Sequence, residues 1–243
     1  MTRMEKASIN QPQTPGGACS VMLSGAGGAL GQAIERCAHN DDQVAIVARY
    51  QQAGGFVGEP LGDVIIDVSH HTRTPDVVAF ARRHGCALLI GTTALDEATL
   101  KAIGQAGQDI AVCVAANFSP SAWAFEQMAQ WAAEHLPTFD VALRETHHVH
   151  KKDAPSGTAL RLQHALAPHR TLAVPIESIR EGEVVGQHEV NFTDGDERLS
   201  LVHDITNRDV FARGALALAR RLADQPPGQY SVGDLWGVGR ALG

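Results

Sequence analysis

Residues 147–152 read His-His-Val-His-Lys-Lys, so three histidines and two lysines lie within six consecutive positions. Histidine titrates near neutral pH and can pass a proton to a reduced substrate, and lysine can hold a carboxylate or donate a proton. We expect this segment to follow a strand and to precede a helix that begins at Ser156-Gly157-Thr158. The N–H groups and hydroxyls at such a helix start form a further site for an anion. These residue types therefore predict a pocket for a small di-acid, with a proton relay beside it.

The same histidines could instead bind a metal ion, with ligands from His147, His148 and His150. The neighbouring lysines would add positive charge beside a cation, and adjacent residues on a strand point to opposite faces. No second cluster of ligands is evident in the sequence. We therefore predict no metal site, and the remaining alternative is a basic loop exposed to solvent.

A second candidate site is the glycine-rich turn at residues 24–31, Ser-Gly-Ala-Gly-Gly-Ala-Leu-Gly, which follows an apolar run and opens a helix. Bare backbone at a helix N-terminus is typical of a site for a dinucleotide pyrophosphate. Leu30 stands where a strict G-x-G-x-x-G pattern has its third glycine, so Gly25-x-x-Gly28-x-x-Gly31 is the better register. No lysine followed by serine or threonine is present here, which excludes a P-loop. A plain tight turn is the alternative to a nucleotide site.

The end of the next apolar run bears on the choice of cofactor. A carboxylate at this place would bind the ribose 2′-hydroxyl of NAD, but the chain reads Ala48-Arg49. A guanidinium suits a 2′-phosphate. We therefore predict NADPH as the preferred cofactor and NADH as the alternative, unless Arg49 is only a solvated surface residue.

Short apolar runs alternate with amphipathic segments through the first half of the chain. This alternation predicts βαβ units and a Rossmann-like, doubly wound parallel sheet of five strands in an α/β protein. The expected strands are 21–24, 44–48, 64–68, 87–90 and 110–115, and the expected helices are 29–38, 75–84 and 96–105.

The pattern changes near residues 117–120. We expect an α+β substrate and oligomerisation domain over 119–207, with helices at 119–135 and 156–165, a strand at 140–145, and a hairpin of 183–192 with 197–203. An amphipathic helix at 209–222 would cover the parallel sheet, so the dinucleotide-binding domain is predicted as 19–118 plus 208–243. Residues after 222 are expected to be irregular, and residues 1–18 to form a flexible tail.

Composition narrows the classes of partner. The 243 residues include 20 Lys and Arg against 27 Asp and Glu, and only 5% are aromatic, which argues against nucleic-acid binding. No apolar stretch reaches the roughly 18 residues of a membrane span, so no membrane partner is predicted. Four widely separated cysteines without a C-x-x-C motif favour reduced thiols and a cytoplasmic location.

Residues 145–158 resemble the signature E-x-H-H-x-H-K-x-D-A-P-S-G-T of the 4-hydroxy-tetrahydrodipicolinate reductase (dihydrodipicolinate reductase) family. Further similarity lies in the glycine turn, in residues 91–93 and 115–119, and in the order of residues 188–235, so that it covers about residues 20–236. The resemblance implies reduction of 4-hydroxy-tetrahydrodipicolinate (dihydrodipicolinate) to tetrahydrodipicolinate with NADPH or NADH. This reaction belongs to lysine and diaminopimelate biosynthesis, and the family fold implies a homotetramer.

The resemblance also implies roles for individual residues, at the positions that match the family pattern. It implies that His147 is a proton donor and acceptor and that Lys151 is a proton donor. The implied substrate-binding residues are His148, Ser156, Gly157, Thr158 and Arg208. The implied cofactor-binding residues are Gly25, Ala26, Gly27, Gly28, Ala29, Leu30, Arg49, Gly91, Thr92, Thr93, Ala115, Ala116, Asn117 and Phe118.

Two departures from the family pattern concern the cofactor. Ala48 replaces the usual acidic residue, and the segment 49–63 between the second and third expected strands is short. Two alternative functions are a reductase of another small imine or carbonyl dicarboxylate that uses NADPH, and an NADPH-binding protein without activity. The pair of His147 and Lys151 argues against the second, because a binding protein has no need of a proton donor beside a cation.

Overall fold

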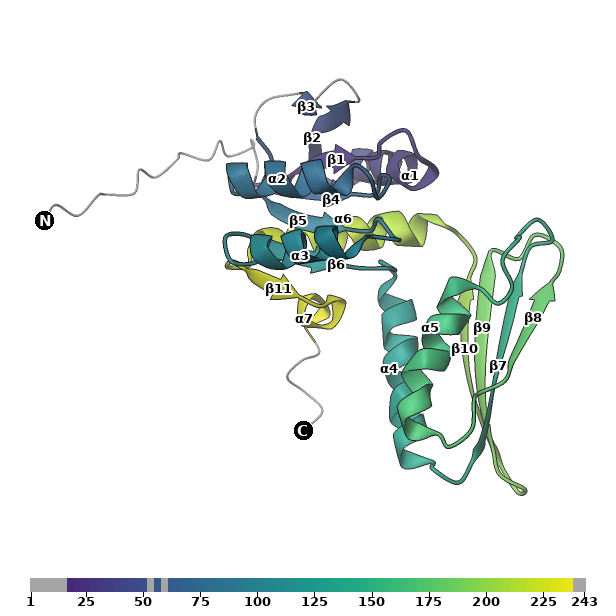
Figure 1. The fold of residues 1–243 in the computed structure, drawn as a ribbon. Coiled ribbons are helices and arrows are strands. Elements are labelled where there is room, and N and C mark those ends of the chain that lie inside the picture. The colour runs from purple at the N-terminus through teal and green to yellow at the C-terminus, as the bar shows by residue number, and fades with distance from the viewer. Residues whose placement is uncertain (1–16, 52–54, 58–60, 238–243) are drawn as a thin grey trace, which may run out of the picture. The chain divides into compact units, whose positions relative to one another are not determined.

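The structure is a computed structural model that describes residues 17–51, 55–57 and 61–237. The described chain divides into two compact units (Figure 1). The first unit runs to Ala116 and resumes at Ala212, and the second is Asn117–Phe211. The domain boundaries expected from the sequence differ from these by a few residues. Most of the expected tail, residues 1–16, lies outside the described residues.

A seven-stranded sheet in the order β11-β6-β5-β4-β1-β2-β3 forms the centre of the first unit. Every strand pair is parallel except β2 with β3. The strands are β1 (Cys19–Ser24), β2 (Val44–Gln51), β3 (Gly55–Val57), β4 (Val64–Asp67), β5 (Ala87–Ile90), β6 (Ala111–Val114) and β11 (Gly228–Tyr230). The strands β4 and β5 are buried at every position, as a parallel sheet with both faces covered requires.

The helices of this unit are α1 (Ala29–His39), α2 (Thr74–His84), α3 (Glu97–Ala106), α6 (Asp209–Ala223, which begins in the second unit) and α7 (Val232–Trp236). Side chains of α2 and α3, among them Val77 and Ile103, share a core with Met22, Ile65 and Leu88 of the sheet. This arrangement confirms the predicted α/β fold with a Rossmann-like sheet.

The expected sheet of five strands was incomplete, because β3 and β11 extend it at its two edges. The strand β3 lies within the segment 49–63 that was expected to be a connection, and Tyr50 of β2 pairs with Phe56. The chain end was expected to be irregular, but Gly228 pairs with Ala111 of β6, and α7 follows. Three-residue strands without a run of apolar residues give no periodic signal, so only their pairing partners define them.

The second unit contains a four-stranded sheet in the order β10-β9-β7-β8. Its strands are β7 (Asp140–His147), β8 (Ile176–Arg180), β9 (Gly186–Thr193) and β10 (Arg198–Ile205). The helices α4 (Pro120–His135) and α5 (Gly157–Leu166), followed by a 3₁₀ turn at Ala167–His169, lie on one side of this sheet (Figure 1). Phe125 of α4 and Leu162 of α5 pack with Val190 and Phe192 of β9 in one core.

Two details of this unit differ from expectation, and both affect the site. The strand β7 extends two residues further than 140–145, to His147, and β8 was not foreseen at all. The expected helix start at Ser156 is confirmed, because the Ser156 hydroxyl accepts a hydrogen bond from the Ala159 N–H at 3.2 Å. Among the described residues, no helix has the length and apolar character needed to cross a membrane.

Candidate active site

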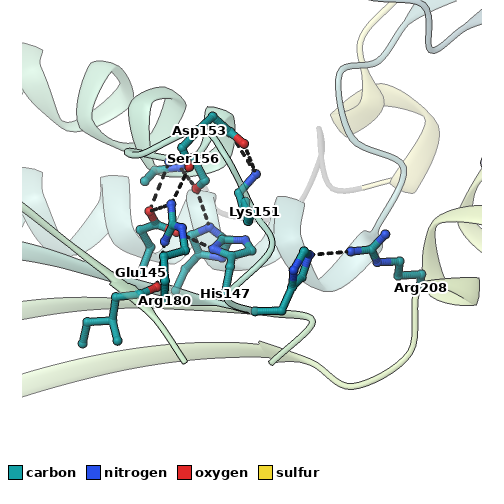
Figure 2. Close-up of polar contacts among 11 residues, drawn as sticks. Glu145, His147, Lys151, Asp153, Ser156, Arg180 and Arg208 are labelled. Atoms are coloured by element: carbon teal, nitrogen blue, oxygen red, sulfur yellow. Dashed lines mark hydrogen bonds and ion pairs between the residues drawn. The ribbon is translucent and has the colours of Figure 1, made fainter. Parts of the chain in front are cut away.

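The candidate proton donor His147 is the last residue of β7, and Glu145 precedes it by two positions. Residues two apart on a strand share a face of the sheet, so both side chains point the same way. Glu145 is completely buried and His147 nearly so. The carboxylate Oε2 of Glu145 accepts a short hydrogen bond from the Nδ1 atom of His147 (Figure 2). The extension of β7 therefore creates a buried pair of carboxylate and imidazole.

The other carboxylate oxygen of Glu145 is anchored from two directions. Its Oε1 atom accepts hydrogen bonds from the Arg180 guanidinium at 2.8 Å and from the Ser156 N–H at 3.2 Å. Arg180 also donates to the backbone carbonyl of Asp153, which ties β8 to the loop after β7 (Figure 2). Burial opposes ionisation of Glu145, but hydrogen bonds from Arg180 and Ser178 and the nearby His147 hold the pKa of Glu145 below its ordinary value.

A second buried histidine, His188 of β9, lies opposite Glu145 in the antiparallel pairing of β7 with β9. Its ring meets that of His147 edge to face, with centroids 5.3 Å apart. The His188 Nε2 atom bonds to the Ser156 hydroxyl at 3.2 Å. Burial lowers the pKa of His188 to about 4, with a further contribution from His147, so His188 is neutral at pH 7.

The pKa of His147 is also below the ordinary value for histidine. Burial is the largest cause, and the charges of Lys151 and Arg180 act in the same direction. Glu145 acts in the opposite direction, through its charge and its hydrogen bond. The protonation of His147 is therefore a balance in which the carboxylate favours the imidazolium form.

Glu145, His147 and His188 place their ligand atoms within 4.8 Å of one another, which is a possible arrangement for a metal ion. This set differs from His147, His148 and His150, which the sequence suggested. No second ligand cluster is evident in the sequence, because β9 contributes His188 from a distant part of the chain. However, the carboxylate already accepts from Arg180, Ser156 and His147, so its oxygens serve a hydrogen-bond network.

Lys151 follows β7 and directs its ammonium group to the carboxylate of Asp153, at 2.7 and 2.8 Å (Figure 2). The Lys151 side chain is 21% exposed and that of Asp153 is 58% exposed, so the pair borders solvent. His148 is joined to Arg208, whose Nη2 atom lies 3.0 Å from the His148 Nε2 atom (Figure 2). The structure thus brings together two residues that the resemblance assigned to the substrate.

The start of α5 supplies the remaining predicted substrate residues. Ser156 is buried and caps the helix, whereas Gly157 is exposed. A Cβ atom at Gly157 would meet nothing within 4 Å, so the backbone of the first helical turn is open to a ligand. Helix N-termini of this kind attract carboxylates.

Glu145, Arg180 and His188 were not predicted from the sequence as functional residues. The alternation of strand residues could have identified Glu145, since it shares a face with His147. Arg180 and His188 reach the site through β8 and β9, and no local signal in the sequence reports that pairing.

In the first unit, the glycine turn between β1 and α1 has two positions where a side chain would not fit. Gly25 has a φ of +94°, and a Cβ there would lie 2.5 Å from the Val68 carbonyl oxygen. A Cβ at Gly31 would lie 2.1 Å from the Gly25 carbonyl oxygen. The Gly28 N–H closes the turn by donating to that oxygen at 3.0 Å. No side chain caps the start of α1 at Gly28, which leaves the backbone accessible to a phosphate.

Other predicted cofactor segments lie at the same edge of the sheet, where the parallel strands end. The Gly91 N–H donates to the Asp67 carbonyl at 2.8 Å, and the Thr92 hydroxyl donates to the same oxygen at 3.3 Å. The Ala115 N–H donates to the Ile90 carbonyl at 2.8 Å. At the end of β1, the buried Ser24 hydroxyl has no hydrogen-bond partner among the described residues. This Ser24 hydroxyl and the strand ends around it fit a dinucleotide site.

The last two predicted cofactor residues, Asn117 and Phe118, belong to the second unit.

Arg49 of β2 pairs with Leu23 in the strand register, which also places it at this edge. Its guanidinium forms an ion pair with Glu35 of α1. The Arg49 side chain is 52% exposed. The predicted phosphate-binding residue therefore already has a carboxylate partner, which the sequence did not reveal.

Comparisons with known proteins agree for both halves of the chain. The family model described as dihydrodipicolinate reductase, N-terminus, matches residues 19–118, and the one described as dihydrodipicolinate reductase, C-terminus, matches residues 122–236. The 4-hydroxy-tetrahydrodipicolinate reductase of Xanthomonas campestris pv. campestris is 41% identical over 230 residues, which cover 88% of this chain and 96% of that protein. The protein of the same name from Gluconobacter oxydans is 40% identical over 189 residues, which cover 71% of this chain and 76% of that protein.

A solved structure is similar in fold. Dipicolinate-bound dihydrodipicolinate reductase from Paenisporosarcina sp. TG-14 superposes with a TM-score of 0.76 at 21% sequence identity. The match covers 88% of this chain and 97% of that one.

Proposed function

This chain belongs to the dihydrodipicolinate reductase family, and from that premise we infer that it reduces 4-hydroxy-tetrahydrodipicolinate to tetrahydrodipicolinate with a nicotinamide cofactor. The reaction belongs to lysine and diaminopimelate biosynthesis. It consumes one hydride and one proton and releases one water molecule. The observation that supports this conclusion most directly is the 41% identity to a reductase of this name over 88% of the chain.

For the proton transfers, we propose His147 as a proton donor and acceptor and Lys151 as a second proton donor. When bound, the nicotinamide supplies a hydride. Addition of a hydride to a conjugated imine leaves electron density on the ring, and an acid must then protonate a ring carbon. His147 is suited to this step because Glu145 favours its protonated form, while burial and Lys151 limit how firmly the proton is held.

For substrate binding, we propose that His148, Arg208 and the start of α5 at Ser156-Gly157-Thr158 hold the two carboxylates. The contact between Arg208 and His148 supports a shared site for an anion on the second unit. The exposed backbone at Gly157 supports a second such site. A guanidinium and a helix N-terminus are both common partners of carboxylates.

For the cofactor, we propose a preference for NADPH. The pyrophosphate would lie on the glycine turn of residues 25–30, with further contacts from residues 91–93 and 115–118. Arg49 lies at the strand edge where a 2′-phosphate would be expected, and Ala48 provides no carboxylate to compete for a ribose hydroxyl. Glu35 holds Arg49 through a surface ion pair, which a phosphate can displace.

We further propose a cytoplasmic homotetramer. The face of the four-stranded sheet opposite its helices includes Val202, which is 58% exposed, and an Arg144 that bonds to Glu177 at 2.8 Å. Such a face can associate with another copy of the chain. Buried thiols at Cys86 and Cys113 are consistent with a reducing compartment. Light scattering on the purified protein should give four times the mass of the chain, and a monomer mass would reject the tetramer.

The proposed roles are tested by measuring NADPH oxidation in a coupled assay that generates the hydroxylated ring in situ. We expect His147→Ala and Lys151→Ala each to lower kcat by roughly 10²- to 10⁴-fold, the usual range for a general acid, with little change in NADPH affinity. Lys152→Ala is the matched control, because Lys152 is exposed and adjacent. Near-full activity in either of the first two variants would overturn the assigned role. A wild-type chain that binds NADPH without turnover would favour the non-catalytic alternative.

A second substrate class is distinguished by the same assay. A panel of small imine and carbonyl dicarboxylates should be reduced far more slowly than the ring substrate. A faster rate with one of them would indicate the alternative reductase.

A further inference from the structure

We propose that Glu145, held in place by Arg180, is the residue that positions His147 and fixes which of its ring nitrogens exchanges a proton with the substrate. This inference deepens the proposed function and rests on His147 being the proton donor. Glu145 does not touch the substrate in this proposal, and it acts only through the imidazole.

The first support is the completeness of the contacts around the carboxylate. Glu145 has no exposed surface, and its two oxygens accept hydrogen bonds from His147, Arg180 and the Ser156 N–H, with Ser178 as a further donor. These donors belong to β7, β8 and the start of α5. Burial of a carboxylate costs free energy unless its oxygens accept hydrogen bonds. Here Oε1 accepts from Arg180 and Ser156, which leaves Oε2 for the imidazole.

The second support is the packing of the imidazole itself. A Cβ atom built on Gly186 of β9 would lie 3.1 Å from the His147 Nε2 atom and 3.3 Å from its Cδ2 atom. The absence of a side chain at Gly186 therefore leaves room beside the Nε2 edge of the ring. The hydrogen bond at Nδ1 and the edge-to-face contact with His188 restrict rotation of the ring.

The chemical consequence follows from the identity of the acceptor. An ionised carboxylate can only accept, so the Nδ1 atom of His147 must carry a proton in both protonation states of the ring. The second proton, on Nε2, is then the one that is given up. In the proton-transfer step the Nε2–H bond breaks and a C–H bond forms at the electron-rich ring carbon, which leaves a neutral imidazole still bonded to Glu145.

The charged and titratable groups around His147 make opposite contributions. Glu145 raises the pKa of His147, whereas Lys151 and Arg180 lower it in addition to burial. His188 faces the ring from β9 and is neutral at pH 7. Glu145 and Arg180 therefore predict opposite effects when their charges are removed.

The first experiment uses Glu145→Gln and reads the tautomer directly. The glutamine oxygen should accept from Arg180 and Ser156, as Oε1 does, so the amide NH₂ group would face His147. The Nδ1 atom must then become an acceptor, and the ring should change to the Nε2–H tautomer. Long-range ¹H–¹⁵N spectra of histidine-labelled protein measure this change, with the His147 signals assigned from His147→Gln. We expect a loss in kcat of roughly 10²- to 10³-fold.

The second experiment compares pH profiles of kcat. Because the donor must be protonated, activity falls as pH rises through the pKa of His147. Glu145→Gln should move this fall to lower pH, and Arg180→Gln should move it to higher pH. Glu145→Asp keeps the charge on a shorter side chain and should restore part of the rate and of the wild-type profile. A role limited to stability would not produce shifts of opposite sign.

The control is Glu126→Gln, which removes a partly buried carboxylate of α4 that is paired with Arg161. It should leave kcat, the tautomer and the pH profile unchanged. If Glu145→Gln keeps the wild-type tautomer and profile while His147→Gln is inactive, the positioning role is wrong and the proposed function stands. If His147→Gln is fully active, the assignment of the proton donor fails first.

Discussion

Two cations that the sequence assigned to anionic ligands have carboxylate partners in the structure. Lys151 pairs with Asp153, and Arg49 pairs with Glu35. Both pairs border solvent, where an ion pair contributes only about 0–1 kcal/mol. A substrate carboxylate or a cofactor phosphate can therefore replace the partner at small cost. In the proposed function, each ion pair would orient its cation before the ligand binds.

Substitutions of Arg49 and of its partner Glu35 should change the affinity for NADPH in opposite directions. Arg49→Ala should weaken NADPH binding more than NADH binding, because only NADPH carries the 2′-phosphate. Glu35→Gln should tighten NADPH binding by roughly two- to fivefold, since removing a surface partner changes the free energy by less than about 1 kcal/mol. Calorimetric titration with both cofactors measures these effects. An equal loss for NADPH and NADH in Arg49→Ala would remove the argument for a 2′-phosphate site.

Among the secondary-structure elements, the connection between β1 and α1 depends on glycine at some positions more than at others. A Cβ at Gly31 would collide with the Gly25 carbonyl at 2.1 Å, whereas a Cβ at Gly27 would meet nothing within 4 Å. Gly31 is therefore required for packing of the helix against the turn. Gly27 instead leaves the backbone bare, with open space where a side chain would stand.

We expect Gly31→Ala and Gly27→Ala to differ in their effects on stability. Gly31→Ala should lower the free energy of unfolding by about 1–3 kcal/mol or more, because the helix start must move away from the turn. Gly27→Ala should change it by less than about 0.5 kcal/mol. Urea denaturation of both variants provides the comparison. Equal stability of the two would contradict the close contact at Gly31.

For the molecule as a whole, the buried histidines of the second unit link stability to pH. Burial lowers the pKa of His188 from 6.5 to about 4. Between these values the unfolded chain binds a proton that the folded chain does not. The free energy of unfolding therefore falls as the pH decreases through this window, by about 3 kcal/mol in total for this one group.

We expect His188→Gln to reduce this dependence on pH, although the variant will be less stable at pH 7 because His188 bonds to Ser156. Urea denaturation at pH 7, 6 and 5 should give a smaller decrease for His188→Gln than for the wild type. His150→Gln is the matched control, because His150 is an exposed histidine of the same unit. If His188→Gln loses stability with decreasing pH as steeply as the wild type, another group is responsible.

Local patterns in the sequence were sufficient to predict the parallel strands, several helix starts and the family of this protein. The alternation of apolar runs predicted the parallel strands, residues such as Ser156 and Asp96 marked helix starts, and the signature of residues 145–158 identified the family. These signals are local because each depends on residues a few positions apart: strand and helix periodicity, a capping hydroxyl, or a glycine at a turn.

Which distant segments of the chain meet became evident only in the folded protein. It paired β8 and β9 with β7, which brought Arg180 and His188 to the buried Glu145, and it placed Glu35 against Arg49. It also gave Gly228–Tyr230 a place beside β6. Sheet pairing and burial depend on contacts between residues far apart in the chain, and no short window of sequence specifies them.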